Sequence, residues 1–204
     1  MSEPTSAEAL EAGRAALDQV VREVQVAAER FDAVLPALER LLAVRGRVVV
    51  TGLGKSGLVG AKLAATLAST GTPAFFVHAA DALHGDAGMV GPDDLLLAIS
   101  KSGSTAEVVR FAEVVAARGV EVVAMTGCGG SSALCKLATA TIDIGVTTEA
   151  DPFDLVPTSS TAVTLVVGDA LAVALMVARG FGPADFHAHH PGGALGARLE
   201  GEVS

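Results

Sequence analysis

The chain of 204 residues is long enough to bury one substantial core and is close to the upper size of a single domain. Its formal net charge of −9 argues against a nucleic-acid partner, because the phosphate backbone requires a basic face. Trp and Tyr are absent, which disfavours a site that stacks bases or sugars on those rings. A small anionic ligand stays open, since one local site can be positive on an acidic protein.

The cysteines and the polar N-terminal residues predict a reduced, cytoplasmic setting. Cys128 and Cys135 are the only cysteines, and we expect both to be packing residues. The segment from Thr161 to Ala178 approaches the length and hydrophobicity of a membrane span, but Gly168 and Asp169 lie in its middle. We therefore expect a buried core or interface helix and no membrane partner.

The elements in chain order predict an α/β fold. Residues 1–45 are expected to form a helical arm of one or two amphipathic helices, followed by a single domain over 46–204. The predicted strands are 47–51, 74–77, 95–100, 121–126 and 141–145. The predicted helices are 57–70, 79–84, 105–118, 131–138 and 159–179. Apolar strands alternating with helices indicate a three-layer sandwich around a parallel sheet, with ligands beyond the carboxyl ends of the strands.

A glycine-rich turn between the first strand and its helix predicts an anion site. The stretch from Val48 to Gly57 runs from β-branched residues into a turn that carries Lys55 and Ser56. Such a turn leaves backbone N–H groups free at a helix N-terminus, where an anion is favoured. A dinucleotide fingerprint is disfavoured because His78, not an acidic residue, follows the second strand, and a P-loop because Val49 stands where that motif needs glycine.

A second loop, rich in hydroxyl groups, follows the third strand. This hydroxyl loop (residues 100–105) contains Ser100, Ser102, Gly103, Ser104 and Thr105. Hydroxyls and backbone N–H groups can hold a phosphate without a metal. The alternative is a capping box formed by Ser104 and Glu107. We favour phosphate binding, because three hydroxyls and a glycine exceed what a cap needs.

Several motifs occur together in a specific order. They are Gly54-Lys-Ser-Gly57, Ala68-Ser-Thr-Gly-Thr-Pro-Ala-Phe-Phe-Val-His78, His84-Gly-Asp86, Ser100-x-Ser-Gly103, Pro157-Thr-Ser-Ser-Thr161, Gly168-Asp-Ala-Leu-Ala-Val-Ala174, Ala178-Arg-Gly-Phe181 and His190-Pro-Gly-Gly-Ala-Leu-Gly196. In combination they resemble the sugar isomerase (SIS) domain of the arabinose-5-phosphate isomerase family, over nearly the whole chain. The resemblance implies a five-stranded flavodoxin-like sheet and a homotetramer with shared active sites. It also implies cofactor-free interconversion of D-arabinose 5-phosphate and D-ribulose 5-phosphate.

The resemblance also implies which residues form the site. The catalytic positions are matched by Lys55, Glu107, Glu149 and His190, with His84 as a further active-site histidine. The phosphate-binding positions are matched by Ser56, Ser100, Ser102 and Thr105, and Gly54, Gly103 and Ser104 complete the two loops.

An isomerase of this kind needs a base, a way to open a cyclic sugar and stabilisation of an enediolate. We expect Glu149 to be the base, with desolvation raising its pKa towards working pH. His190 is expected to open the ring or move a proton between sugar oxygens, and Lys55 to bind the phosphate or the enediolate. Glu107 is expected to position Lys55 or a substrate hydroxyl, and His84 to contact the substrate.

The sequence departs from the usual family pattern in three places. Lys101 and Ser104 alter the hydroxyl loop, and Asp151, Phe153 and Asp154 alter the segment after Glu149. In this family a regulatory CBS pair usually follows the SIS domain, whereas this sequence ends soon after Gly196, so we expect a SIS domain without the CBS pair.

These departures leave two alternatives, an isomerase of another sugar phosphate such as a hexulose 6-phosphate, and a non-catalytic phosphosugar-binding regulator. His187, His189 and His190 raise the possibility of a metal, but no Cys or carboxylate cluster completes a set, so we expect no essential metal.

Overall fold

The structure, a computed structural model, describes residues 5–189. Its five parallel strands form one sheet in the order β2-β1-β3-β4-β5. They are β1 (Val48–Gly52), β2 (Ala74–His78), β3 (Leu95–Ile99), β4 (Glu121–Thr126) and β5 (Ala140–Asp143). This strand order is flavodoxin-like, which confirms the predicted fold.

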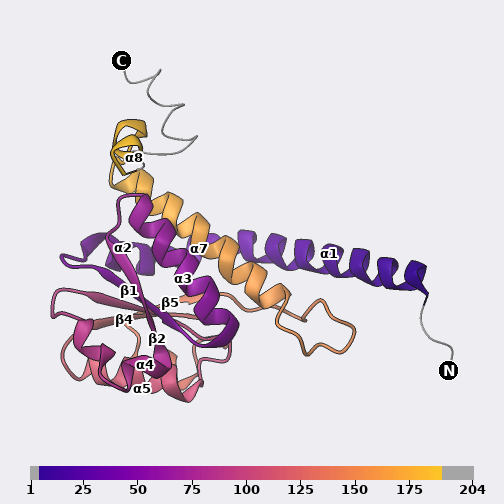
Figure 1. Cartoon of the computed structure of the whole chain (residues 1–204), viewed down its shortest axis with the longest axis horizontal. Helices are drawn as coiled ribbons and strands as arrows, with labels where there is room; N and C mark the ends of the chain where they lie inside the picture. The colour runs from indigo at the N-terminus through magenta and orange to yellow at the C-terminus, as the bar shows by residue number, and fades with distance from the viewer. Residues whose placement is uncertain (1–4, 190–204) are drawn as a thin grey trace.

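Helices cover both faces of the sheet (Figure 1). One face carries α1 (Ser6–Glu29), α2 (Leu35–Ala43), α3 (Gly54–Ser69) and α7 (Ser159–Ala178). The other carries α4 (Ala79–Ala82), α5 (Ala106–Ala116) and α6 (Ala133–Leu137). Two 3-10 helices, η1 (Phe31–Val34) and η2 (Asp86–Met89), and a final helix, α8 (Pro183–His189), complete the described elements. α1 extends well beyond the sheet, as Figure 1 shows.

The strands are apolar throughout because each side of the sheet has its own core. In β1, Val48 and Val50 point into the core under α3 and α7, whereas Val49 points into the core under α5. In β3, Leu97 likewise points into the core under α3 and α7, and Leu96 points into the core under α5. This is the pattern that two covering helical layers require of a parallel sheet.

Element boundaries differ from the prediction where glycines and termini are involved. The first turn of α3 begins at Gly54 rather than 57, so the glycine-rich turn is itself the start of the helix. The strand predicted at 141–145 ends at Asp143. The arm contains two helices joined by η1, and α8 was not predicted.

The apolar segment near the C-terminus forms a core helix, as predicted. α7 is long and apolar enough to cross a membrane by length and composition alone. In this protein its buried side, which includes Val163, Val167 and Leu171, packs in the core beneath α1, α2 and α3. Gly168 allows the α3–α7 approach, since a Cβ there would lie 3.1 Å from Leu63.

Candidate active site

The turn after β1 lies at the carboxyl edge of the sheet, where the strand order reverses between β1 and β3. Gly54 has φ +57°, a conformation that favours glycine, and it directs the chain into α3. Leu53 at the N-cap supplies no side-chain hydrogen bond to the first turn of α3. Lys55 is exposed and Ser56 is half-buried, and both stand in the first turn of α3 beside its backbone N–H groups. The start of α3 therefore offers positive charge and hydrogen-bond donors to an anion.

The hydroxyl loop follows β3 at the same edge of the sheet. The Ser100 Oγ lies 2.9 Å from the Thr105 Oγ1 and accepts the N–H of Gly103 at 3.1 Å. The Ser102 Oγ accepts the N–H of Ser104 at 3.2 Å and its hydroxyl at 3.0 Å. The loop is thus a compact turn in which the predicted phosphate-binding hydroxyls are neighbours.

The alternative interpretation of Ser104 and Glu107 as a capping box does not hold, and this agrees with the preference for the phosphate interpretation. α5 begins at Ala106, its N-cap is Thr105, and that N-cap makes no side-chain capping hydrogen bond. The Ser104 hydroxyl donates to Ser102 instead. Helix capping therefore does not account for the hydroxyls of this loop.

Gly103 is a position where the loop tolerates no side chain. It has φ +61°, and a Cβ there would lie 2.1 Å from the Ser132 Oγ and 2.6 Å from the Ser132 Cβ. Gly103→Ala is expected to lower the free energy of unfolding by ~2–4 kcal/mol, combining the left-handed backbone cost with overpacking. Urea unfolding measures this loss. Gly119→Ala is the control, because Gly119 has φ +81° and open space around its Cβ. Equal losses in the two variants would contradict the clash with Ser132.

Glu149, between β5 and α7, is only 3 % exposed. Its carboxylate accepts a hydrogen bond from the Lys101 Nζ at 2.6 Å. The N–H groups of Thr158 and Ser160 donate to it at 2.8 and 3.0 Å. The hydroxyls of the same two residues also donate to it. This buried carboxylate therefore has a full set of donors, as a buried charge requires.

The expectation that desolvation raises the pKa of Glu149 is wrong. Burial does push the pKa upward, but hydrogen bonds from Lys101, Ser160 and Thr158 outweigh it and lower the pKa from 4.5 to about 2. The ion pair could not be predicted from the sequence, because Lys101 lies 48 positions before Glu149 in the chain. Glu149 is therefore ionised throughout the neutral pH range.

A cleft joins the two loops and the segment around Glu149. We call it the carboxyl-edge cleft, and its volume is about 200 Å³. It is lined by Leu53, Lys55, Ser56, Val59, Lys101, Pro157, Ser160, Thr161 and Thr164. Glu149 adjoins it through its bonds to Lys101 and Ser160. Glu149 and the hydroxyl loop consequently lie at the same edge of the sheet in one chain.

Two acidic side chains, Asp151 and Asp154, shape the segment around Glu149. The Asp154 carboxylate accepts the N–H of Glu149 at 2.6 Å, and Asp154 itself has φ +55°. Asp151 accepts three N–H groups of the following loop. The Thr158 Oγ1 accepts the N–H of Ala150 at 2.7 Å. These carboxylates fold the loop that holds Glu149 in place.

Glu23, in the helical arm, was not predicted from the sequence. Its carboxylate is 3 % exposed and accepts the N–H groups of Thr147 and Thr148 at 3.0 and 3.3 Å. Gln19 also donates to it, at 2.8 Å. The sequence did contain a sign that Glu23 is buried, because it stands four positions before the buried Ala27 and so lies on the same side of α1. The arm therefore supports the segment that leads to Glu149.

Glu23→Ala should leave the N–H groups of Thr147 and Thr148 without their acceptor. We expect the free energy of unfolding to fall by about 1–3 kcal/mol. Glu23→Gln keeps one acceptor oxygen and should lose less stability. Glu11→Ala, on an exposed part of α1, is the control. Urea unfolding measures these losses, and a Glu23→Ala protein as stable as the control would refute the supporting role.

The remaining predicted residues lie away from this cleft or outside the described region. Glu107 is half-buried in the first turn of α5, and His84 is exposed just after α4. Neither lines the carboxyl-edge cleft, and of the hydroxyl loop only Lys101 lines it, so the loop's hydroxyls stand next to the cleft rather than in its wall. His190 lies outside the described residues. Among residues 5–189, no group of three or more His, Cys, Asp or Glu side chains is arranged to hold a metal ion.

α8 lies at the opposite, amino edge of the sheet. Phe181, which leads into α8, packs against Gly71, just before β2. Arg179 donates to the Thr72 hydroxyl at 3.0 Å. Figure 1 shows α8 beyond the end of α7 that is farthest from the Glu149 loop. His189, the last described residue, is therefore on the far side of the chain's fold from Glu149.

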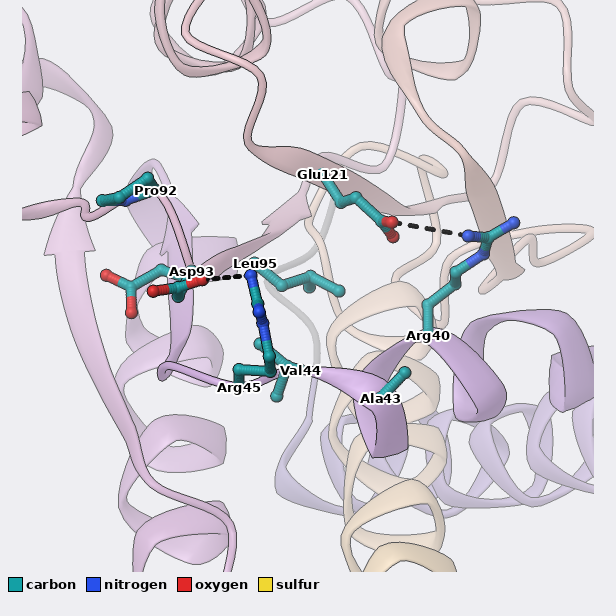
Figure 2. A pocket seen from close by; sticks show the side chains of 9 residues that line it. Arg40, Ala43, Val44, Arg45, Pro92, Asp93, Leu95 and Glu121 are labelled. Atoms are coloured by element: carbon teal, nitrogen blue, oxygen red, sulfur yellow. Dashed lines mark hydrogen bonds and ion pairs between the residues drawn. The ribbon is translucent and has the colours of Figure 1, made fainter.

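A second cleft lies at this amino edge and contains none of the predicted site residues (Figure 2). Its two guanidinium groups are already paired, Arg40 with Glu121 at 3.4 Å and Arg45 with Asp93 at 2.6 Å. Leu95 and Glu121, which line it, are the first residues of their strands. In doubly wound folds ligands bind at the other edge, so we place the candidate site in the carboxyl-edge cleft.

The sheet order and the two anion-suited loops at its switch point define a doubly wound α/β protein. The SIS domain family matches residues 41–174, and the chain belongs to this family.

Its relatives include isomerases. The chain is 58 % identical over 168 residues to the arabinose 5-phosphate isomerase KdsD of Pseudomonas aeruginosa, which covers 82 % of this chain and 51 % of the relative. It is 50 % identical over 195 residues to the arabinose 5-phosphate isomerase GutQ of Escherichia coli K12, covering 95 % of this chain and 60 % of the relative. The chain thus spans about half to three fifths of these proteins.

A solved structure of similar fold is an E. coli CFT073 protein in complex with arabinose 5-phosphate. It has a TM-score of 0.87 and 36 % identity, and the match covers 92 % of this chain and 100 % of that one. A Listeria monocytogenes protein described as a putative sugar-phosphate isomerase also has a TM-score of 0.87, at 27 % identity, covering 93 % of this chain and 100 % of that one.

Proposed function

We propose that this chain is a phosphosugar aldose–ketose isomerase that interconverts D-arabinose 5-phosphate and D-ribulose 5-phosphate. The observation that carries the proposal is the placement of a buried, ionised carboxylate, Glu149, beside a cleft lined by Lys55 and Ser56 of the first loop and by Lys101 of the hydroxyl loop. The similarity to isomerases named for arabinose 5-phosphate supports this substrate.

In the proposed mechanism the two loops hold the phosphate. The hydroxyls of Ser100, Ser102 and Thr105 and the N–H groups at the start of α3 donate to its oxygens. The pairing between Ser100 and Thr105 keeps these hydroxyls in position before the ligand arrives. Fixing the phosphate places the carbonyl end of the open-chain sugar near Glu149.

Glu149 acts as the base. It removes the proton from C2 of the aldose, the C2–H electrons form a C1–C2 double bond, and the carbonyl oxygen on C1 becomes an oxyanion. Return of the proton to C1, with transfer of the O2 proton to O1, gives the ketose. Lys55 and Lys101 are the cations available at the cleft to stabilise the enediolate, and movement of Lys101 from Glu149 to the substrate would strengthen the base.

A neighbouring subunit completes the site in this proposal. His189 lies at the edge opposite Glu149, which supports delivery of the next residue, His190, to another subunit's cleft. There it would open the sugar ring or move the proton between oxygens. A cleft of about 200 Å³ is smaller than usual for a small-molecule site, which also supports a second chain at its wall.

We propose a homotetramer. Apolar side chains are available for its contacts, since Leu17 on α1 is 68 % exposed and Phe153 and Leu155 in the Glu149 loop are 77 % and 75 % exposed. A cytoplasmic setting is part of the proposal, supported by the two free thiols. Glu107 and His84 are proposed to reach the substrate only in the assembled enzyme.

The ion pair of Glu149 favours one alternative, a non-catalytic phosphosugar-binding protein. A carboxylate with a pKa of about 2 is a weak base, and a general base works best with a pKa near the operating pH. In a binding protein the same pair would simply hold the cleft together.

An assay of ribulose 5-phosphate formation from arabinose 5-phosphate separates the two functions. It is paired with a thermal-shift panel of pentose and hexose phosphates, because ligands bound only by the folded state raise its stability. Turnover supports the isomerase. A thermal shift with arabinose 5-phosphate but no turnover would assign the binding function, and turnover of a hexulose 6-phosphate alone would reassign the substrate.

A further inference from the structure

The two cysteines of the chain face each other beside the hydroxyl loop. Cys128 follows β4 and Cys135 lies in α6, and their Sγ atoms are 3.5 Å apart. Both residues are half-buried, so a small reagent can reach them. Gly129 and Gly130 between them have positive φ values of +62° and +87°. A disulfide needs an S–S separation of about 2.05 Å, so a further approach of about 1.5 Å would join them.

Cys128 has the properties of a reactive thiol. Burial alone would raise its pKa, but hydrogen bonds from Ser132, Thr126 and Cys135 outweigh burial and lower the pKa to about 6. The Thr126 Oγ1 lies 3.1 Å from its Sγ. Cys128 is therefore largely a thiolate at neutral pH, and the thiolate is the form that attacks oxidants.

The cysteine segment is bonded directly to the hydroxyl loop. The N–H of Gly127 donates to the Lys101 carbonyl oxygen at 2.9 Å, and the N–H of Leu134 donates to the Gly103 carbonyl oxygen at 3.0 Å. The Thr126 hydroxyl, which contacts Cys128, donates to the Lys101 carbonyl oxygen as well, at 3.3 Å. Movement of the cysteines would therefore displace the hydroxyl loop, including Lys101, which pairs with Glu149.

We propose that Cys128 and Cys135 form a reversible intramolecular disulfide in the presence of a hydroperoxide, and that this bond shifts the hydroxyl loop. The Cys128 thiolate attacks one peroxide oxygen, the O–O bond breaks, and a sulfenic acid and an alkoxide or hydroxide form. The Cys135 thiol then attacks the Cys128 Sγ, the S–O bond breaks, and water leaves. The net reaction takes two thiols and one hydroperoxide to one disulfide, one alcohol or water, and one further water.

The effect of this bond on turnover depends on the proposed function, whereas formation of the bond does not. A displacement of about 1 Å in a positioning loop can cost up to 100-fold in rate, so we expect the disulfide form to have kcat/KM lowered at least about tenfold. Reduction with dithiothreitol is expected to restore it.

Intact-protein mass spectrometry tests the bond itself. The reduced protein is treated with hydrogen peroxide, then unfolded in N-ethylmaleimide, which labels every free thiol. We expect loss of about 2 Da and no label, reversed by dithiothreitol, as two thiols become one disulfide. Cys135→Ser should stop at the Cys128 sulfenic acid, trapped with dimedone, and Cys128→Ser should retain a labelled Cys135. Two labelled thiols in wild type after peroxide, or disulfide-linked dimers on a non-reducing gel, would overturn the proposal.

A separate control tests whether the disulfide changes ligand binding at the hydroxyl loop. The double variant Cys128→Ser/Cys135→Ser should bind arabinose 5-phosphate like the reduced wild type and be insensitive to peroxide in a thermal-shift titration. Equal sensitivity in the double variant, or an oxidised wild type with unchanged ligand binding, would overturn the coupling. If the disulfide forms but the protein has no isomerase activity, the disulfide proposal is supported and the proposed function is rejected.

Discussion

Glu149→Gln is expected to lower kcat for arabinose 5-phosphate by about 10²–10⁴-fold, the usual contribution of a positioned general base. Glutamine keeps the size of the side chain and one acceptor oxygen for the N–H groups of Thr158 and Ser160. It cannot accept the C2 proton. Because the phosphate is held by a different loop, the thermal shift given by arabinose 5-phosphate should persist. Steady-state kinetics and the thermal shift together measure the two effects.

The matched control is Glu121→Gln, which changes a carboxylate at the amino edge of the sheet (Figure 2). It should leave kcat unchanged. A Glu149→Gln enzyme as active as this control would remove Glu149 as the base.

Lys101→Met is expected to move the acidic limb of the kcat/KM profile upward by about 1–2 pH units. In the wild type, the pKa of Glu149 is lowered to about 2 against the effect of burial, with Lys101 foremost among the groups that lower it. Removing the ammonium raises that pKa. Glu149 then becomes protonated, and inactive as a base, at a higher pH as the solution is acidified.

Lys62→Met is the control for Lys101→Met, because it removes a lysine from an ion pair as well, that of Lys62 with Asp169 on the exposed surface of α3 and α7. Its profile should coincide with that of the wild type. An acidic limb at the same pH in all three proteins would show that the ion pair with Lys101 does not govern the base.

Much of the fold could be predicted from the sequence, because the signals that specify it are local. Apolar strands separated by helices left few arrangements other than a doubly wound sheet. Boundaries failed where backbone conformation was the deciding factor, as at Gly54, whose positive φ lets α3 begin three residues earlier than its apolar periodicity suggests.

The site was less predictable because its contacts are long-range. Hydroxyls beside a glycine are visible in a sequence, but the pairing of Lys101 with Glu149 depends on how two loops meet. Without this ion pair, burial alone predicts a raised pKa for Glu149, which is opposite to the lowered pKa in the structure. Glu23 was missed for the same reason, because the backbone N–H groups of Thr147 and Thr148 that it accepts lie more than 120 positions later in the chain.

The most direct test follows hydrogen exchange in D₂O. Arabinose 5-phosphate is incubated with the wild-type protein and with Glu149→Gln, and the sugar is analysed by proton NMR. Enolisation by a carboxylate that shares its proton with solvent predicts loss of the C2 proton signal and deuterium at C1 of the ketose, with neither change in the variant. A sugar that binds the wild type but keeps its C2 proton, or equal exchange in both proteins, would contradict the account.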